Sequence, residues 1–215
     1  MKAFTSCKMA MEHCITNRSF AIAHLYHDDK PMDMHIHDCC EIYYSISGGK
    51  QFLIDNRFYD IEPGDLFFIN PYESHHLTQV DTGVHERIVL SIHPDFLKAL
   101  SSACTDLSYC FTRREQTVSH KLHLDPEMSR RFIYLVHKIA DAEGFGADLT
   151  ERCAFTELMV FLNKVFYQVC HSIRSESGSA NHAQVDDILT YINLHISEEL
   201  TLSALSDHYY LSSSY

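Results

Sequence analysis

The sequence lacks the patterns that mark several well-defined classes of protein. Its eight cysteines form no CxxC pair, so the sequence indicates neither a zinc ribbon nor a disulfide framework. No apolar run approaches the roughly 20 residues that a membrane span requires, and polar residues interrupt segment 1–8. We therefore expect a reduced, cytoplasmic protein with no membrane partner.

Basic residues are also scarce. The sequence contains seventeen lysines and arginines and twenty-nine acidic residues, which gives a formal net charge of -12. This is the wrong sign for a surface that holds DNA phosphates, so this stretch alone is not expected to bind nucleic acid. The sixteen histidines reduce the deficit only where their surroundings protonate them.

Most catalytic motifs are missing as well. The sequence contains no GxGxxG or Walker-type glycine loop, no nucleophile beside a base in a recognisable elbow, and no anchor for a glycosidase carboxylate pair. Only metal-dependent chemistry remains as an enzymatic alternative.

The first half of the chain reads as a series of short strands. With 215 residues, 46% hydrophobic and 21% charged, the chain can bury a full core, and we expect one domain plus an appendage. Turn signals at Gly48-Gly49 and Pro63-Gly64 separate the predicted strands, which cover residues 19–26, 41–47, 50–55, 58–61, 66–69, 75–80 and 85–92. Strands this short and regular predict a β-barrel, so the expected fold class is mainly β with α.

The second half changes to helical periodicity. Short-helix spacing appears at 96–100, Asp125-Pro126 caps a longer helix, and another is predicted over 150–171. This last helix carries two apolar stripes, Ala154/Leu158/Phe161/Val165 and Phe155/Met159/Leu162/Phe166/Val169. Two interpretations remain open: one stripe faces a second subunit, or both are intramolecular core.

These patterns divide the chain into five parts. Residues 1–18 form an arm that covers the barrel mouth or, alternatively, a disordered terminus. The remaining parts are a barrel over 19–100, a helical region over 101–174, a small and polar linker over 175–182, and a helical segment over 183–215. In the last part, an amphipathic helix over 185–196 precedes a second helix that begins behind a Thr201 N-cap, and a turn follows at 210–212.

One group of polar residues is the candidate site. Side chains alternate along a strand, so we expect His35, His37 and Glu41 to share a face, with His75 arriving from a later strand. These four can hold a divalent metal, or they can pair with one another for purely structural reasons. They can also line a pocket for a small molecule. Further candidates for its lining share strand parity or a nearby strand face: Tyr43, Ser45, His24 and Tyr26. His76 and His85 are expected to be solvent-facing or pairing histidines.

The site residues resemble the two cupin motifs, HxH(x)3E(x)6G and PxG(x)2H. His35, His37, Glu41 and Gly48 match the first motif; in the second, Asn70 replaces the proline and Tyr72 the glycine, while His75 keeps its place. The resemblance implies a cupin-like barrel (double-stranded β-helix), in whose enzymatic members the histidines and the glutamate hold a divalent metal.

The order of barrel, helical pair, linker and tail resembles the AraC/XylS family of transcriptional regulators. The segments that carry this resemblance are 35–38, 41–44, 63–65, 69–75 and 187–206. The resemblance implies a small-molecule effector, a homodimer, and DNA binding by helix-turn-helix units in a full-length protein. Here the chain stops at residue 215, where the recognition helix should begin, so we expect a truncated regulator that is not an enzyme and does not itself bind DNA. A stand-alone metal-dependent cupin enzyme, such as a dioxygenase or sugar isomerase, is the alternative, and a dimerisation module with an empty barrel is a third class.

Overall fold

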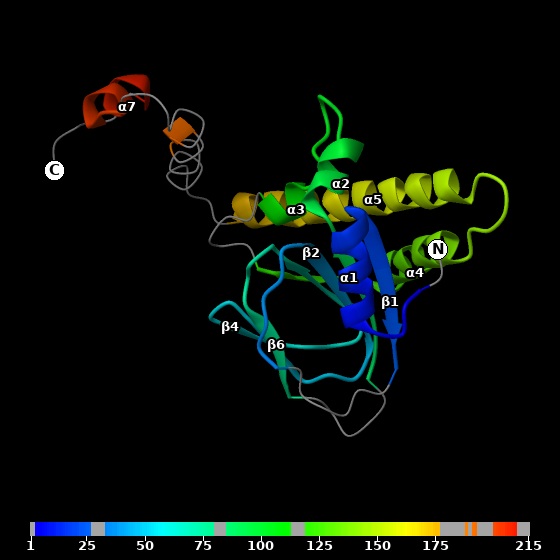
Figure 1. The fold of residues 1–215 in the computed structure, drawn as a ribbon. Helices are drawn as coiled ribbons and strands as arrows, with labels where there is room; N and C mark the ends of the chain where they lie inside the picture. Colours follow the sequence, from blue (N-terminus) through cyan, green and yellow to red (C-terminus); the bar gives the residue numbers. More distant parts are fainter. Residues whose placement is uncertain are drawn as a thin grey trace. The chain divides into compact units, whose positions relative to one another are not determined.

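Two antiparallel sheets form the barrel in the computed structural model, which describes residues 3–26, 33–79, 85–112, 119–176, 188, 191–192 and 200–209 (Figure 1). One sheet has the order β1-β7-β2-β5-β8 and the other β4-β3-β6. The strands are β1 (Phe20–Leu25), β2 (Cys40–Ser47), β3 (Gln51–Ile54), β4 (Arg57–Asp60), β5 (Asp65–Ile69), β6 (His75–Gln79), β7 (Glu86–Ile92) and β8 (Lys121–His123). The prediction of a mainly β fold with helices is confirmed.

Strand alternation decides which side chains enter the barrel. In β2 and β7, Tyr43 lies opposite Val89, and both belong to the interior apolar cluster. The rings of Phe52 and Phe67 are fully buried in the same cluster, 5.3 Å apart between centroids. Residues of the other parity face the helices, because a one-residue step turns a side chain to the opposite side of the sheet.

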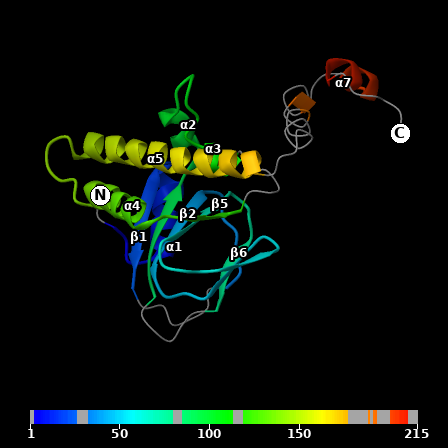
Figure 2. The same ribbon diagram turned by 180° about the vertical axis from the view of Figure 1, so that it is seen from behind.

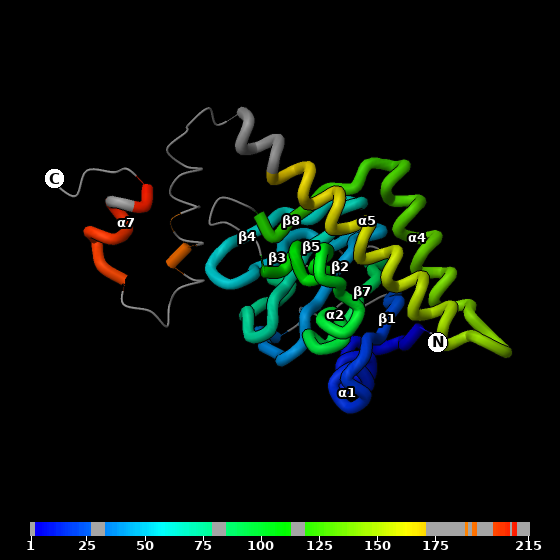
Figure 3. The backbone as a smooth tube through the Cα atoms, turned by 90° about the horizontal axis from the view of Figure 1, so that it is seen from above, coloured from blue at the N-terminus to red at the C-terminus, as the bar shows by residue number. Residues whose placement is uncertain are grey.

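A helical layer covers the outer face of the five-stranded sheet (Figure 2). Its helices are α2 (Pro94–Leu100), α3 (Tyr109–Thr112), α4 (Pro126–Ala140) and α5 (Ala147–Glu176). Phe155 of α5 stacks on Phe20 of β1 at 4.2 Å, and Phe166 meets Phe68 of β5 at 5.5 Å. Figure 3 shows α4 alongside α5. The Asp125 cap is confirmed, since its carboxylate accepts from two N–H groups of the first turn of α4 at 2.8 Å.

Both apolar stripes of α5 are buried within the single chain. Eight of the nine stripe residues have exposures of 7% or less, and only Val169, at 39%, is exposed. The interpretation that one stripe faces a second subunit is therefore wrong, because the sheet and α4 already cover it. Any homodimer must use another surface.

The described part of the N-terminal arm, residues 3–18, packs against the barrel. Helix α1 (Cys7–Asn17) places Ala10 and Cys14, both fully buried, in the interior cluster. Ahead of it, the Phe4 N–H donates to the Ile22 carbonyl at 2.7 Å, and the His24 N–H donates to the Phe4 carbonyl at 2.9 Å. The alternative of a disordered terminus is wrong for these residues, because apolar burial and two main-chain hydrogen bonds hold the arm against β1.

Strand β8 was not predicted, and several predicted segments fall on residues that the structure does not describe. Strand β8 pairs with β5 inside the region that was predicted to be helical only. Three residues are too few for a periodicity signal, so the neighbouring strand decides it. The predicted linker over 175–182 begins too early, because residues 175 and 176 still belong to helix α5. The rest of the linker, the residues 81–84 between two predicted strands, the turn at 210–212 and most of the 185–196 helix lie outside the described residues; within that helix, Ile188, Tyr191 and Ile192 are helical.

The chain divides into two compact units, Met1–Tyr167 and Gln168–Tyr215. In the second unit, α7 (Leu202–Tyr209) begins behind Thr201, whose hydroxyl accepts from the Ala204 N–H at 3.1 Å. The predicted N-cap is confirmed. Among the described helices, none combines the length and apolarity needed to cross a membrane.

Candidate functional site

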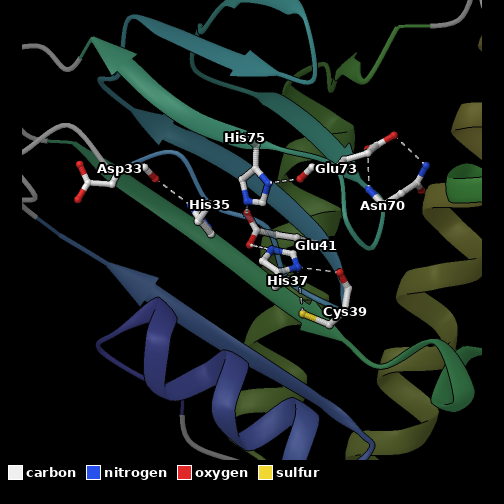
Figure 4. A network of polar contacts seen from close by, with 8 residues as sticks. All are labelled: Asp33, His35, His37, Cys39, Glu41, Asn70, Glu73 and His75. Carbon is white, nitrogen blue, oxygen red and sulfur yellow. Dashed lines mark hydrogen bonds and ion pairs between the residues drawn. The ribbon is translucent and has the colours of Figure 1, made fainter.

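Three predicted site histidines meet at one end of the barrel interior (Figure 4). Only Glu41 lies on β2. His35 and His37 precede that strand, and a main-chain bridge pairs His35 with His75 at the start of β6. The expectation that positions 35, 37 and 41 share one strand is therefore wrong, although the bridge brings the same side chains together.

Glu41 lies between two of these histidines. Its Oε2 is 3.2 Å from His37 Nε2, and its Oε1 is 3.8 Å from His75 Nε2. The candidate ligand atoms of the three histidines all lie within 4.8 Å of one another. His37 and His75 are buried, whereas His35 is half-buried at the edge of the cluster.

Main-chain carbonyls fix the orientation of all three rings. The Nδ1 atoms of His35, His37 and His75 lie 3.0, 2.9 and 2.9 Å from the carbonyl oxygens of Asp33, Cys39 and Glu73. A carbonyl oxygen only accepts, so each Nδ1 carries the proton and each Nε2 is the atom left for another partner.

The Nε2 of His75 has no hydrogen-bond partner within the described part of the chain. Its side chain is fully buried, and the Glu41 oxygen at 3.8 Å is beyond hydrogen-bond range. Leaving a buried acceptor unmatched costs about 1–3 kcal/mol. A ligand supplied from outside the chain would relieve this cost.

Burial and charge act in opposite directions on the pKa values of the site. Burial lowers the pKa of His37, but contacts with Cys39 and Glu41 outweigh it and raise this pKa to about 10. Burial opposes ionisation of Glu41, yet the three histidines hold its pKa below the usual value. Burial lowers the pKa of His75, which therefore keeps a free Nε2 lone pair. Without a ligand, the site holds a His37 imidazolium beside a Glu41 carboxylate.

The donor set fits a divalent metal ion. Three imidazole nitrogens and a carboxylate suit zinc, iron and similar ions, and hydrogen bonds from the far ring nitrogens to carbonyls are the usual support of metal-binding histidines. His35, His37, His75 and Glu41 would hold the ion, and His37 would release its proton on binding. A bound ion would supply a Lewis acid for an oxygen of a small molecule.

A second polar group faces the same interior, and the sequence analysis did not predict that His85 and Arg87 belong to it. His85 Nε2 is 2.7 Å from the Tyr43 hydroxyl, and its Nδ1 is 3.3 Å from an Arg87 guanidinium nitrogen. All three are buried, and burial raises the pKa of the Tyr43 phenol. Tyr43 is thus interior, as predicted, while His85 is a buried pairing histidine. The parity that 85 and 87 share with Val89 could have placed both inside.

His24 and Tyr26 do not line the interior, contrary to the sequence expectation. They follow the outward parity of β1; His24 bonds Glu86 at 2.8 Å, and Tyr26 is 57% exposed. Ser45 is buried and donates to the Gly48 carbonyl at 3.4 Å, which supports the turn. These three side chains therefore have local roles.

Tyr72, which stands where the second motif has glycine, adopts a backbone conformation that favours glycine. Its φ is 64°, in the left-handed region, and its N–H donates to the His37 carbonyl at 2.8 Å. This conformation costs a residue with a Cβ roughly 1–2 kcal/mol. The motif correspondence therefore holds at the level of backbone geometry.

Substituting glycine at this position should stabilise the protein. The Tyr72 side chain is 70% exposed, so Tyr72→Gly loses little burial and relieves the left-handed strain. Because glycine also loses more chain entropy on folding, we expect a net gain of up to about 1 kcal/mol in the free energy of unfolding. Urea denaturation measures it. Tyr72→Ala is the control, since it keeps the Cβ and should show no gain.

Two antiparallel sheets around an interior His/Glu cluster define a cupin-like barrel. The model of the AraC-like ligand-binding domain matches residues 19–159, more than half of the chain. The chain therefore belongs to the AraC-like ligand-binding domain family. No match is found among the curated proteins.

Similar solved structures include a lyase, a decarboxylase and a cupin barrel protein. DMSP lyase DddQ from Ruegeria pomeroyi DSS-3 shows 24% identity over 35% of this chain and 39% of that chain (TM-score 0.32). Oxalate decarboxylase from Bacillus subtilis shows 20% identity over 38% of this chain and 23% of that chain, with a TM-score of 0.32. A cupin 2 conserved barrel domain protein from Rhodopseudomonas palustris shows 17% identity over 38% of this chain and 63% of that chain, also with a TM-score of 0.32. In each case the chain covers less than two thirds of the similar protein.

Proposed function

We propose that the chain is the effector-sensing part of an AraC-type transcriptional regulator. A small molecule such as a sugar or another metabolite binds inside the barrel, at the cluster of His35, His37, Glu41 and His75, with Tyr43 further along the same strand face. The tethered helical segment belongs to a DNA-binding domain in the full-length protein, which acts as a homodimer.

The unmatched Nε2 of the fully buried His75 is the observation that carries this proposal. Burial of such an atom without a hydrogen bond is unfavourable, so a ligand that reaches it would be stabilised. The described residues include two more such atoms, His76 Nδ1 and His120 Nε2, but of the three only the His75 atom lies in the histidine cluster. Membership of a ligand-binding family supports the same assignment. An effector can shift the regulator only by its different affinity for two states, typically about 1–3 kcal/mol.

A second candidate is a metal-dependent cupin enzyme. The convergence of the candidate ligand atoms of three histidines within 4.8 Å favours it, since the effector pocket alone does not require three imidazoles. The two functions differ in whether the site turns a bound molecule over.

Ligand screening separates these candidates. We expect a panel of sugars, carboxylic acids and other metabolites to contain a compound that raises Tm in wild-type protein but not in His37→Ala, and that is recovered unchanged. Elemental analysis of protein purified without added metal shows whether an ion accompanies it. Turnover of the compound, dependent on stoichiometric metal that His37→Ala loses, would support the enzyme instead. A panel without any thermal shift would contradict effector sensing and favour a dimerisation module.

A further inference from the structure

The loop between β5 and β6 holds both buried site histidines through main-chain atoms. The Tyr72 N–H donates to the His37 carbonyl at 2.8 Å, and the Glu73 carbonyl accepts from the Nδ1–H of His75 at 2.9 Å. Any movement of this loop therefore changes the direction in which the His75 ring points. The loop has to be fixed for the cluster to keep its geometry.

The Glu73 carboxylate fixes the loop. Its Oε2 accepts from the Asn70 N–H at 2.7 Å, and its Oε1 accepts from the Asn70 side-chain amide at 3.0 Å (Figure 4). Charged acceptors with two donors form some of the stronger hydrogen bonds in proteins. One side chain thus closes the turn whose carbonyl orients His75.

The same carboxylate lies close to the segment that leads into the helices. Its Oε2 is 3.4 Å from Nε2 of His120, at ion-pair distance but without a hydrogen bond, and Nδ1 of His120 is 2.8 Å from the Tyr59 hydroxyl. The His120 carbonyl accepts from the Phe68 N–H at 3.0 Å, so its position on β5 is fixed. Strand β8 starts at the next residue and runs on to the Asp125 cap of α4.

We propose that Glu73 is the positioning residue of the interior cluster and connects His75 to the helical layer through His120. This positioning role rests on the proposed function in one respect, namely that His75 contacts the effector or a bound ion. Binding that pulls on His75 moves the Glu73 carbonyl, and the carboxylate transmits the displacement to His120 and the start of β8. A cleft of ≈ 1090 Å³ borders Glu73 and His120 on the outside of the barrel, so the contact has room to shift.

Nitrogen NMR of the imidazole rings tests the positioning role without any ligand. In wild-type protein we expect His75 as a single Nδ1–H tautomer. In Glu73→Gln, whose amide nitrogen cannot accept from the Asn70 N–H, we expect mixed tautomers or exchange broadening of His75. Glu86→Gln is the matched control, because Glu86 is likewise a glutamate beside a histidine, with its Oε1 2.8 Å from His24 Nε2, but on the outer face. An unchanged His75 spectrum in Glu73→Gln would overturn the positioning role.

Binding of Co²⁺ gives a second readout. Loss of an outer hydrogen-bond partner weakens metal sites by roughly 10–100-fold. Glu73→Gln keeps the carbonyl that is this partner of His75 but loosens the turn that holds it, so we expect a weakening of up to about 10-fold, the lower end of this range, in a titration followed by visible absorption. If wild-type protein binds no Co²⁺, the ion site fails, while the tautomer measurement still decides the role of Glu73. Asn70→Ala, which removes a donor to the same carboxylate, replaces Glu73→Gln should the latter not fold.

His120→Ala tests the connection to the helices. We expect the His75 ring signals to shift in this variant although the two residues belong to different segments. If they coincide with those of wild-type protein, while Glu73→Gln perturbs them, then Glu73 positions His75 but the connection to the helical layer is wrong.

Discussion

Replacing Glu41 with glutamine is expected to lower the free energy of unfolding by about 3 kcal/mol at pH 6 in metal-free protein. The substitution keeps the volume but removes the charge that faces His37 at 3.2 Å. The His37 side chain is only 3% exposed, so water cannot replace the lost partner. Either an imidazolium stays buried without a counter-charge, or the ring gives up its proton. Urea denaturation in the presence of a chelator measures the loss.

Glu86→Gln provides the control for this prediction. It removes the charge from an even shorter histidine contact, 2.8 Å between Glu86 and His24, whose side chains are each 24% exposed. Partly solvated pairs contribute little, so we expect a loss of about 1 kcal/mol or less. Equal losses in the two variants would contradict a stabilising charge pair at the cluster.

The loss of unfolding free energy in Glu41→Gln should become smaller both at low pH and at high pH. The raised pKa of His37 contributes stability that is complete below 6.5 and is lost as the pH rises toward about 10. The lowered pKa of Glu41 contributes stability above 4.5 that is lost as the pH falls through the folded value. The difference between wild type and variant is therefore expected to be largest between pH 4.5 and 6.5. A difference that grows above pH 7 would contradict the assigned charges.

His75→Ala is expected to weaken Co²⁺ binding by at least about 100-fold. A direct ligand contributes more than the outer partners, whose loss costs roughly 10–100-fold. At the same time, removal of the unmatched Nε2 offsets part of the cavity that the ring leaves, so the fold should tolerate the change better than a typical large-to-small core substitution. Titration followed by visible absorption measures the affinity, and urea denaturation the stability.

The neighbouring His76 supplies the matched control for His75→Ala. It is the next residue of β6, so its side chain points to the opposite side of the three-stranded sheet, and it is only half-buried. We expect His76→Ala to keep the wild-type affinity for Co²⁺. Equal affinities in all three proteins would show that the ion does not bind at the cluster.

Strand periodicity was sufficient to predict the barrel and one part of the site. Glu41 and Tyr43 alternate with residues that face the helices, and this two-residue period holds wherever a strand is paired on both sides. It fails at His35 and His37, which lie outside regular strands and are placed by the bridge to β6. It also fails for His24, because the pairing register of β1 with β7 decides whether this side chain faces the interior or the outside.

The sequence by itself determined the mainly β fold, the caps of α4 and α7, and which histidines are candidates for one site, because these depend on local spacing and on residue chemistry. Only the tertiary structure decided that α1 packs into the barrel cluster, that both stripes of α5 are buried, and that Glu73 lies between His120 and the loop that orients His75. These features join residues far apart in the chain, and their energies come from burial and pairing that no local pattern encodes.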